Sequence, residues 1–170
     1  TSVALGDVDG DGHLDLAVGN VNQQNVVYLN DGAGTFDTIT HTFGTGSDQT
    51  YSVALGDVDG DGDLDLAAGN GGEQNVVYLN DGDGTFDTTS YNFGPGSDWT
   101  DSVALGDVDG DGDLDLAVGN SVEQNVVYLN DGDGTFDTTS SNFGPVSDGT
   151  WSVALGDVDG DGDLDLAVGN

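Results

Sequence analysis

The sequence predicts an all-β fold, a β-propeller-type array of four-stranded antiparallel blades, and two observations predict it. A 50-residue unit recurs along the chain, and units 51–100 and 101–150 differ at only seven positions. A repeat period of this length is typical of solenoids, propellers and arrays. Within each unit, short apolar runs are bounded by Gly, Asn and Asp, which is a strand pattern, and no segment has helical periodicity.

Four strands are predicted in each unit, and the second unit serves as the example. The first strand covers about 52–58, and the second, 64–69, places Leu64, Leu66 and Ala68 on one face. The third covers 75–80, where Val76 and Tyr78 face opposite Val77 and Leu79. A Gly-rich turn at 81–84 leads to a fourth strand at roughly 85–93. Four antiparallel strands in about 50 residues describe one propeller blade.

The chain is predicted to be a single repeat domain covering 1–170. It holds three full units, 1–50, 51–100 and 101–150, and a half unit, 151–170. Three and a half blades do not close a ring, since propellers typically have four to eight. The last hairpin is therefore expected to expose a strand edge that invites pairing. Two explanations stay open: the chain continues in a longer array, or copies of it associate into a homo-oligomer, ring or fibre.

The motif that speaks most directly to function is Asp-x-Asp-x-Asp-Gly-x-x-Asp, which begins at Asp7, Asp57, Asp107 and Asp157. Each copy crowds carboxylates together in a chain that has no Lys or Arg to neutralise them. Ca²⁺ takes 6–8 oxygen ligands in flexible geometry and fits such a loop. We therefore expect about four Ca²⁺ per chain.

The ligand assignment follows from the geometry of a tight loop. In the second copy, alternate aspartates turn toward one centre, Gly62 permits the sharp turn, Asp63 lends its backbone carbonyl and Asp65 closes the site. His13 takes the carbonyl position in the first copy, where any side chain is tolerated. The predicted ligands are Asp7, Asp9, Asp11, His13, Asp15, Asp57, Asp59, Asp61, Asp63, Asp65, Asp107, Asp109, Asp111, Asp113, Asp115, Asp157, Asp159, Asp161, Asp163 and Asp165.

Two other interpretations of the motif were weighed. An EF-hand needs a bidentate Glu at loop position 12 and flanking helices. Position 12 is Val18, Ala68, Val118 or Val168, and the flanks have strand character, so an EF-hand is excluded. Merely solvated Asp-Gly turns are the other alternative. They would not need the same four carboxylates in every copy.

The formal net charge of −33 argues against several partners. Four Ca²⁺ would neutralise only eight of these charges, so the protein stays strongly anionic and repels nucleic acid and anionic membranes. No apolar stretch is long enough to predict membrane insertion. The chain has no Cys and its two histidines occur in single units, so no catalytic constellation is predicted and the protein is not expected to be an enzyme.

The residues resemble a known family, the FG-GAP and VCBS repeats of integrin α subunits and many bacterial surface proteins. The resemblance rests on Phe43-Gly44, Phe93-Gly94 and Phe143-Gly144, on the four Gly-Asp-Val-Asp-Gly-Asp-Gly loops, and on Asn-Asp-Gly-Asp-Gly-Thr-Phe at 80–86 and 130–136. Gly19-Asn20 stands where the family name calls for Gly-Ala-Pro, which favours the VCBS branch. The resemblance implies calcium-stapled β-propeller blades, with the cation loop joining the first and second strands. It does not imply one activity.

The predicted function is that of an extracellular or cell-surface calcium-binding repeat protein with a structural or adhesive scaffold role. The alternative is a carbohydrate-binding, lectin-like module, since Tyr51, Tyr91, Trp99 and Trp151 occupy variable positions where rings could stack on sugars. Packing of these rings between neighbouring blades is the competing explanation. Glycans or surface proteins are the expected partners beside further copies of the chain.

Overall fold

The computed structural model describes residues 1–36, 39–86, 89–136, 139–146 and 149–170. They form fourteen strands and no helix. We call residues 1–50, 51–100, 101–150 and 151–170 units 1 to 4. The all-β prediction is confirmed. Among the described residues no helix is long and apolar enough to cross a membrane.

Each full unit is one four-stranded antiparallel sheet in simple sequential order. Unit 1 contains β1 (Ser2–Gly6), β2 (Asp15–Gly19), β3 (Asn25–Leu29) and β4 (Ile39–Phe43). Unit 2 contains β5 (Thr50–Gly56), β6 (Asp65–Asn70), β7 (Asn75–Leu79) and β8 (Thr89–Phe93). Unit 3 contains β9 (Thr100–Gly106), β10 (Asp115–Asn120), β11 (Asn125–Leu129) and β12 (Thr139–Phe143). Unit 4 is the hairpin of β13 (Ser152–Gly156) and β14 (Asp165–Gly169).

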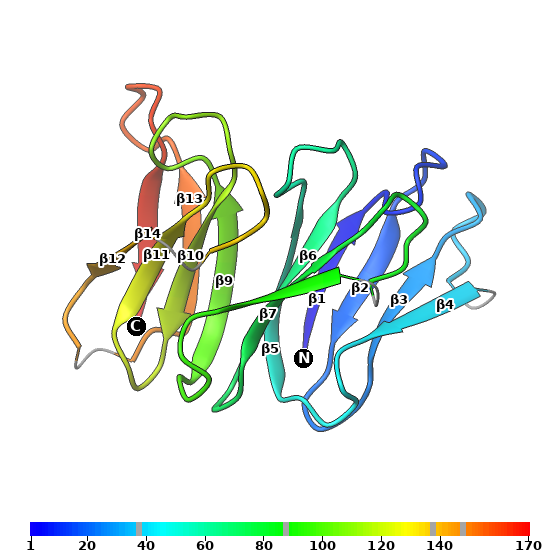
Figure 1. Cartoon of the computed structure of the whole chain (residues 1–170), viewed down its shortest axis with the longest axis horizontal. Helices are drawn as coiled ribbons and strands as arrows, with labels where there is room; N and C mark the ends of the chain where they lie inside the picture. The colour runs from blue at the N-terminus through cyan, green and yellow to red at the C-terminus, as the bar shows by residue number, and fades with distance from the viewer. Residues whose placement is uncertain (37–38, 87–88, 137–138, 147–148) are drawn as a thin grey trace.

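The sheets stand face to face in a row (Figure 1). The first strands of successive units are neighbours, β1 beside β5, β5 beside β9 and β9 beside β13. The described strands form an open row and do not close into a ring. The structure therefore does not show a closed propeller.

The predicted strands of unit 2 differ from the observed ones at their ends, and two of these differences have a clear cause. The first strand of unit 2 ends at Gly56, not at 58, because Asp57 already accepts backbone N–H groups of the loop. The fourth strand begins at Thr89, not near 85, since Phe86 is buried against Phe43 of unit 1 with ring centroids 6.5 Å apart. Residues 87 and 88 of the predicted strand lie outside the described residues.

The core lies between the sheets. One cluster joins Ala17, Val27 and Phe43 of unit 1 to Leu66 and Tyr78 of unit 2. The opposite face of the second sheet carries another cluster, in which Ala67, Val77 and Phe93 meet Leu116 and Phe136 of unit 3. The alternation predicted for the third strand is thus confirmed. The second strand of unit 2, β6, is buried on both faces, because a sheet in the middle of the row has a neighbour on each side.

Equivalent residues of the four units differ in exposure, because a unit that follows another is covered by it and unit 1 is not. Val53, Val103 and Val153 are each 7 % exposed, but the equivalent Val3 is 61 % exposed. Leu5 and Leu14 of unit 1 are also exposed. In unit 2 the corresponding leucines reach back against Gly6, where an added Cβ would lie 2.6 Å from Leu64 Cδ1.

This pair of valines gives a matched test of packing. Val53→Ala should lower the free energy of unfolding by about 1.5–3 kcal/mol, since it removes two buried methyl groups and leaves a cavity. Val3→Ala, the same change on an exposed face, should stay within about 0.5 kcal/mol of wild type. Urea unfolding in saturating Ca²⁺ measures both. Equal losses would show that the units do not pack as described.

Candidate metal centre

The Asp-rich loops join the first and second strands of their units, as predicted. They lie along the same edge of the row (Figure 1). We call the sites that begin at Asp7, Asp57, Asp107 and Asp157 sites 1 to 4. In site 2, Gly60 and Gly62 have φ of 77° and 99°, a region that residues with a Cβ rarely adopt. These glycines let the chain turn tightly around the carboxylates.

The aspartates organise the loop through its backbone. Asp57 accepts the N–H of Gly60 at 2.8 Å and that of Gly62 at 3.0 Å. Asp61 Oδ1 accepts the N–H of Asp63 at 2.9 Å. Sites 3 and 4 repeat these bonds. The loop conformation is therefore set by its own hydrogen bonds, and the remaining lone pairs of the carboxylates are available to a cation.

In every site three carboxylates converge, with one oxygen of each within 4.8 Å of the others. Their identity differs between sites. The groups are Asp7, Asp9 and Asp15; Asp57, Asp59 and Asp61; Asp107, Asp109 and Asp115; and Asp157, Asp159 and Asp165. The first two motif positions thus converge in all four sites. The third motif position, Asp11, Asp111 or Asp161, stands apart from three of these groups, and Asp65 stands apart from the group of site 2.

The last aspartate of the motif also holds the unit together. Asp65 is fully buried, and its two oxygens accept the N–H of Val58 and of Asn80, each at 2.9 Å. Asp15 and Asp115 make the equivalent pairs of bonds. This carboxylate ties the start of the loop to the end of the third strand.

The side chain at the carbonyl position points away from the site. A Cβ on Gly82 would lie 2.6 Å from Asp63 Oδ2, so the Asp63 carboxylate rests on the turn between β7 and β8. Asp113 lies over Gly132 and the His13 imidazole over Gly32 in the same way. In unit 1, hydrogen bonds from the Ala33 N–H and the Thr35 hydroxyl, with a smaller contribution from His13, hold the pKa of Asp31 below its usual value. The carbonyl role of His13, Asp63, Asp113 and Asp163 stays a prediction.

The residues present fit a hard divalent cation. Asp7 Oδ1 is buried and has no hydrogen-bond partner among the described residues, which is costly for a carboxylate oxygen without a counterion. Burial and neighbouring carboxylates raise the pKa values of Asp9 and Asp59. Burial raises the pKa of Asp65 to about 6 and also raises the pKa of Asp115. Each of these penalties falls on the charged form and is relieved when a cation binds.

A pH dependence of the metal-free protein follows. The folded-state pKa of Asp65, about 6, lies above its ordinary value of 3.8, so the folded state takes up the proton first. The contribution of Asp65 to the free energy of unfolding is fully present below about pH 3.8 and is lost as the pH rises through 6. In a chelator, the Tm should be higher at pH 4.5 than at pH 7. Asp65→Asn should flatten this dependence, and a Tm that falls toward pH 4.5 would contradict it.

Sequence reasoning missed a set of buried polar residues that recur in every full unit. Asn75 Nδ2 donates to Oγ1 of Thr100, the first residue of β9, at 2.9 Å, and Thr100 Oγ1 donates to Asn120 Oδ1 of unit 3 at 2.8 Å. Asn80, 1 % exposed, orders the turn after β7 by accepting the N–H groups of Gly82 and Gly84. The signal was present in the sequence, because Asn and Thr recur at these positions in each full repeat without any apolar exchange.

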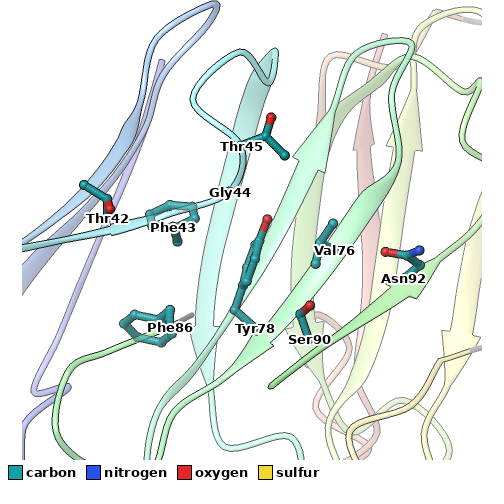
Figure 2. A pocket seen from close by; sticks show the side chains of 9 residues that line it. All are labelled: Thr42, Phe43, Gly44, Thr45, Val76, Tyr78, Phe86, Ser90 and Asn92. Carbon is teal, nitrogen blue, oxygen red and sulfur yellow. The ribbon is translucent and has the colours of Figure 1, made fainter. Parts of the chain in front are cut away.

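A pocket of about 370 Å³ opens between units 1 and 2 (Figure 2). Phe43, Tyr78 and Phe86 line it beside the polar side chains of Thr42, Thr45, Ser90 and Asn92. The rings of Phe43 and Tyr78 pack edge to face, with centroids 5.5 Å apart. Burial, with a smaller contribution from Asp48, raises the pKa of Tyr78 to about 12, so its hydroxyl is protonated at neutral pH.

The variable aromatic residues divide into two groups. Tyr51 and Trp99 pack together over Gly71, with ring centroids 6.2 Å apart, and Gly71 bridges to Trp99 through the backbone. Trp151 and Tyr91 are exposed and have no such ring contact among the described residues, and Trp99 stays as exposed as Tyr91. Tyr51, Trp99 and Gly71 all belong to unit 2, so this contact is made within one unit, and packing of the rings between neighbouring blades stays a prediction.

Comparison with known proteins places the chain in a family. The model of the FG-GAP-like repeat matches residues 7–68, 57–118 and 107–168, each match running from one Asp-rich loop to the next. The chain belongs to the FG-GAP-like repeat family, and the resemblance inferred from its motifs is confirmed. No curated protein matches the chain in sequence.

Two solved structures share the fold at low sequence identity. The biofilm matrix protein Bap1 of V. cholerae superposes with a TM-score of 0.58 and 20 % identity, over 98 % of this chain and 23 % of its own. BBS1N, solved in complex with ARL6DN, superposes with a TM-score of 0.65 and 14 % identity, over 91 % of this chain and 47 % of its own. The chain thus spans less than half the length of either structure.

Proposed function

We propose that this protein is a calcium-binding repeat scaffold with no catalytic role. The observation that carries the proposal is the convergence of three carboxylate oxygens within 4.8 Å in each of the four loops. Oxygen ligands of this kind suit a hard cation, and Ca²⁺ tolerates the irregular geometry of a short loop. Bound Ca²⁺ would offset carboxylate repulsion that the chain, lacking Lys and Arg, cannot offset itself.

The architecture that we propose for the complete assembly is a β-propeller-type array. Its support is the arrangement of the units, whose first strands lie next to one another while the fourth strands lie outermost. Such an order is that of propeller blades around an axis. The family match and the biofilm matrix protein among the similar structures support a structural role at the cell surface or outside the cell.

The two ends of the row suggest how the assembly grows. Val3, Leu5 and Leu14 form an exposed apolar face on unit 1, whereas the equivalent valines of later units are buried and Leu55, Leu64, Leu105 and Leu114 are partly buried. At the other end, an added Cβ on Gly156 would meet nothing within 4 Å, whereas Gly6, Gly56 and Gly106 each receive a leucine of the next unit. The exposed leucines at one end of the row therefore match the uncovered Gly156 at the other end. A further unit, from a longer chain or from another copy, can pack on either end in the way that units 1 to 3 pack on one another.

Association between copies is tested by sedimentation of the 170-residue chain at micromolar concentration in Ca²⁺. We expect species heavier than the monomer that dissociate in Leu5→Gln, because this change places a polar group on the exposed apolar face. The control Val122→Gln alters an exposed valine in the turn between β10 and β11 and should leave the mass unchanged. A wild-type chain that sediments as a monomer would contradict association between copies.

Carbohydrate binding is the second candidate function, and the pocket of Figure 2 favours it. Hydroxyl and amide groups from Thr42, Ser90 and Asn92 lie beside an apolar wall, and none of the described residues that line the pocket is charged. A neutral polar ligand such as a sugar fits this chemistry. A glycan array with wild type and Asn92→Ala tests it. Binding that is absent in wild type, or equal in the two proteins, would remove this candidate.

A further inference from the structure

One side chain links the metal loops of neighbouring units. Asn80 stands at the end of β7, and its amide nitrogen donates to Leu64 O of its own unit at 3.1 Å. The same nitrogen donates to Val8 O of unit 1 at 2.8 Å, across 72 positions of the chain. Val8 lies between Asp7 and Asp9, two carboxylates of site 1. The side chain of unit 2 therefore holds the backbone of the loop in unit 1.

This contact continues to site 2 through an unbroken series of hydrogen bonds. The backbone N–H of Asn80 donates to Asp65 Oδ1 at 2.9 Å, and Asp65 Oδ2 accepts the N–H of Val58 at 2.9 Å. Val58 in turn lies between Asp57 and Asp59. Site 1 and site 2 are thus joined by Val8, Asn80 and Asp65.

The link is repeated between units 2 and 3. Asn130 Nδ2 donates to Val58 O at 2.7 Å, and Asn130 N donates to Asp115 Oδ1 at 3.0 Å. Packing reinforces both contacts, since Val8 and Val58 are each 1 % exposed. A Cβ on Gly84 would already lie 3.5 Å from Val8 Cγ2, so the turn of one unit lies flat on the loop of the preceding unit.

Unit 1 supplies a natural comparison. Asn30 makes the same bonds within its own unit, to Leu14 O and to the N–H groups of Gly32 and Gly34. No bond from Asn30 to another unit occurs among the described residues. At the other end, no asparagine of another unit bonds to the loops of sites 3 and 4 among the described residues, and Val158 is 76 % exposed.

We propose that the metal sites of adjacent units are thermodynamically coupled through Asn80 and Asn130, which act as positioning residues. A cation held by Asp57 and Asp59 in site 2 fixes Val58 between them, and the N–H of Val58 donates to Asp65. Asp65 accepts the N–H of Asn80, whose side-chain amide holds Val8 O and the loop of site 1. Site 1 then loses less conformational freedom when it binds its own cation. The effect is reciprocal, because coupling between two binding equilibria must be. This inference rests on the proposed calcium binding and concerns how the sites act together.

The first test is a site-resolved Ca²⁺ titration of the full chain, followed by the amide NMR signals of Gly10 and Gly12 for site 1 and of Gly60 and Gly62 for site 2. Asn80→Ser keeps a short polar side chain at the turn but cannot reach Val8 O. We expect it to weaken site 1 by about 2- to 10-fold, the range expected for one hydrogen bond. The control Asn30→Ser should lower the Ca²⁺ affinity of site 1, which lies in its own unit, and should leave the Ca²⁺ affinity of site 2 at the wild-type value.

The second test separates coupling from a merely structural role. Asp61→Ala, which disables site 2, should weaken site 1 in the wild-type background and have no further effect on site 1 in Asn80→Ser. If Asp61→Ala leaves site 1 unchanged in wild type, the sites are independent and the inference fails. If Asn80→Ser does not fold, Asn130→Ser gives the same test between sites 3 and 2. Wild type that binds no Ca²⁺ would instead overturn the proposed function itself.

Discussion

Removal of Ca²⁺ should lower the Tm by at least about 20 °C. A ligand at 100 times its Kd stabilises a folded protein by about 2.7 kcal/mol per site. For a domain of this size, each kcal/mol is worth roughly 2–4 °C in Tm. Four sites acting on one row of sheets therefore account for tens of degrees. Differential scanning calorimetry in excess Ca²⁺ and in excess EDTA measures the change.

The control for this prediction is charge screening. At a formal net charge of −33, any salt relieves some repulsion. NaCl at matched ionic strength in EDTA should therefore recover only a small part of the lost Tm. Full recovery by NaCl would show that the loops need screening and not a specific ion.

A matched pair of alanine substitutions should separate the roles of two neighbouring aspartates in site 2. Asp61→Ala removes a converging carboxylate and a bond to the loop backbone, and should weaken site 2 by more than about 100-fold, beyond the usual cost of losing an outer-shell partner. Asp63→Ala keeps its backbone carbonyl, and its side chain lies on Gly82 outside the group. It should cost less than about threefold, the effect of one distant charge in water.

Site-resolved titration of the two variants gives the answer, because site 4, which is not adjacent to site 2, serves as an internal standard. Equal losses in Asp61→Ala and Asp63→Ala would contradict the ligand assignment. A loss in Asp61→Ala that spreads to site 1 is the coupling described above, and it disappears in the Asn80→Ser background.

Local patterns predicted most of the fold. The 50-residue repeat and the short apolar run that contains Val76, Val77 and Tyr78 predicted the strands and their faces, since successive side chains of a strand point to opposite faces of the sheet. The ends of the strands depend on contacts made at a distance. Phe86 leaves its predicted strand because Phe43 of the preceding unit receives it, and no pattern within one unit reports that contact.

The candidate site was predictable in its chemistry and less so in its geometry. The repeated aspartates and Gly62 indicated a cation loop, because these residues lie within nine consecutive positions and their arrangement depends on the local backbone and not on contacts between units. The buried double hydrogen bond of Asp65 and the reach of Asn80 to Val8 O, 72 positions away, depend on how units stack. Such contacts are visible in a sequence only as polar residues that every repeat retains.

The central claim, that the four Asp-rich loops are calcium sites, is tested most directly by native mass spectrometry of the chain across a Ca²⁺ titration. The account predicts discrete additions that stop at four Ca²⁺ per chain and at three in Asp61→Ala. A broad, unsaturating series of adducts that is the same in wild type and in Asp61→Ala would show nonspecific association with a polyanion and would contradict the account.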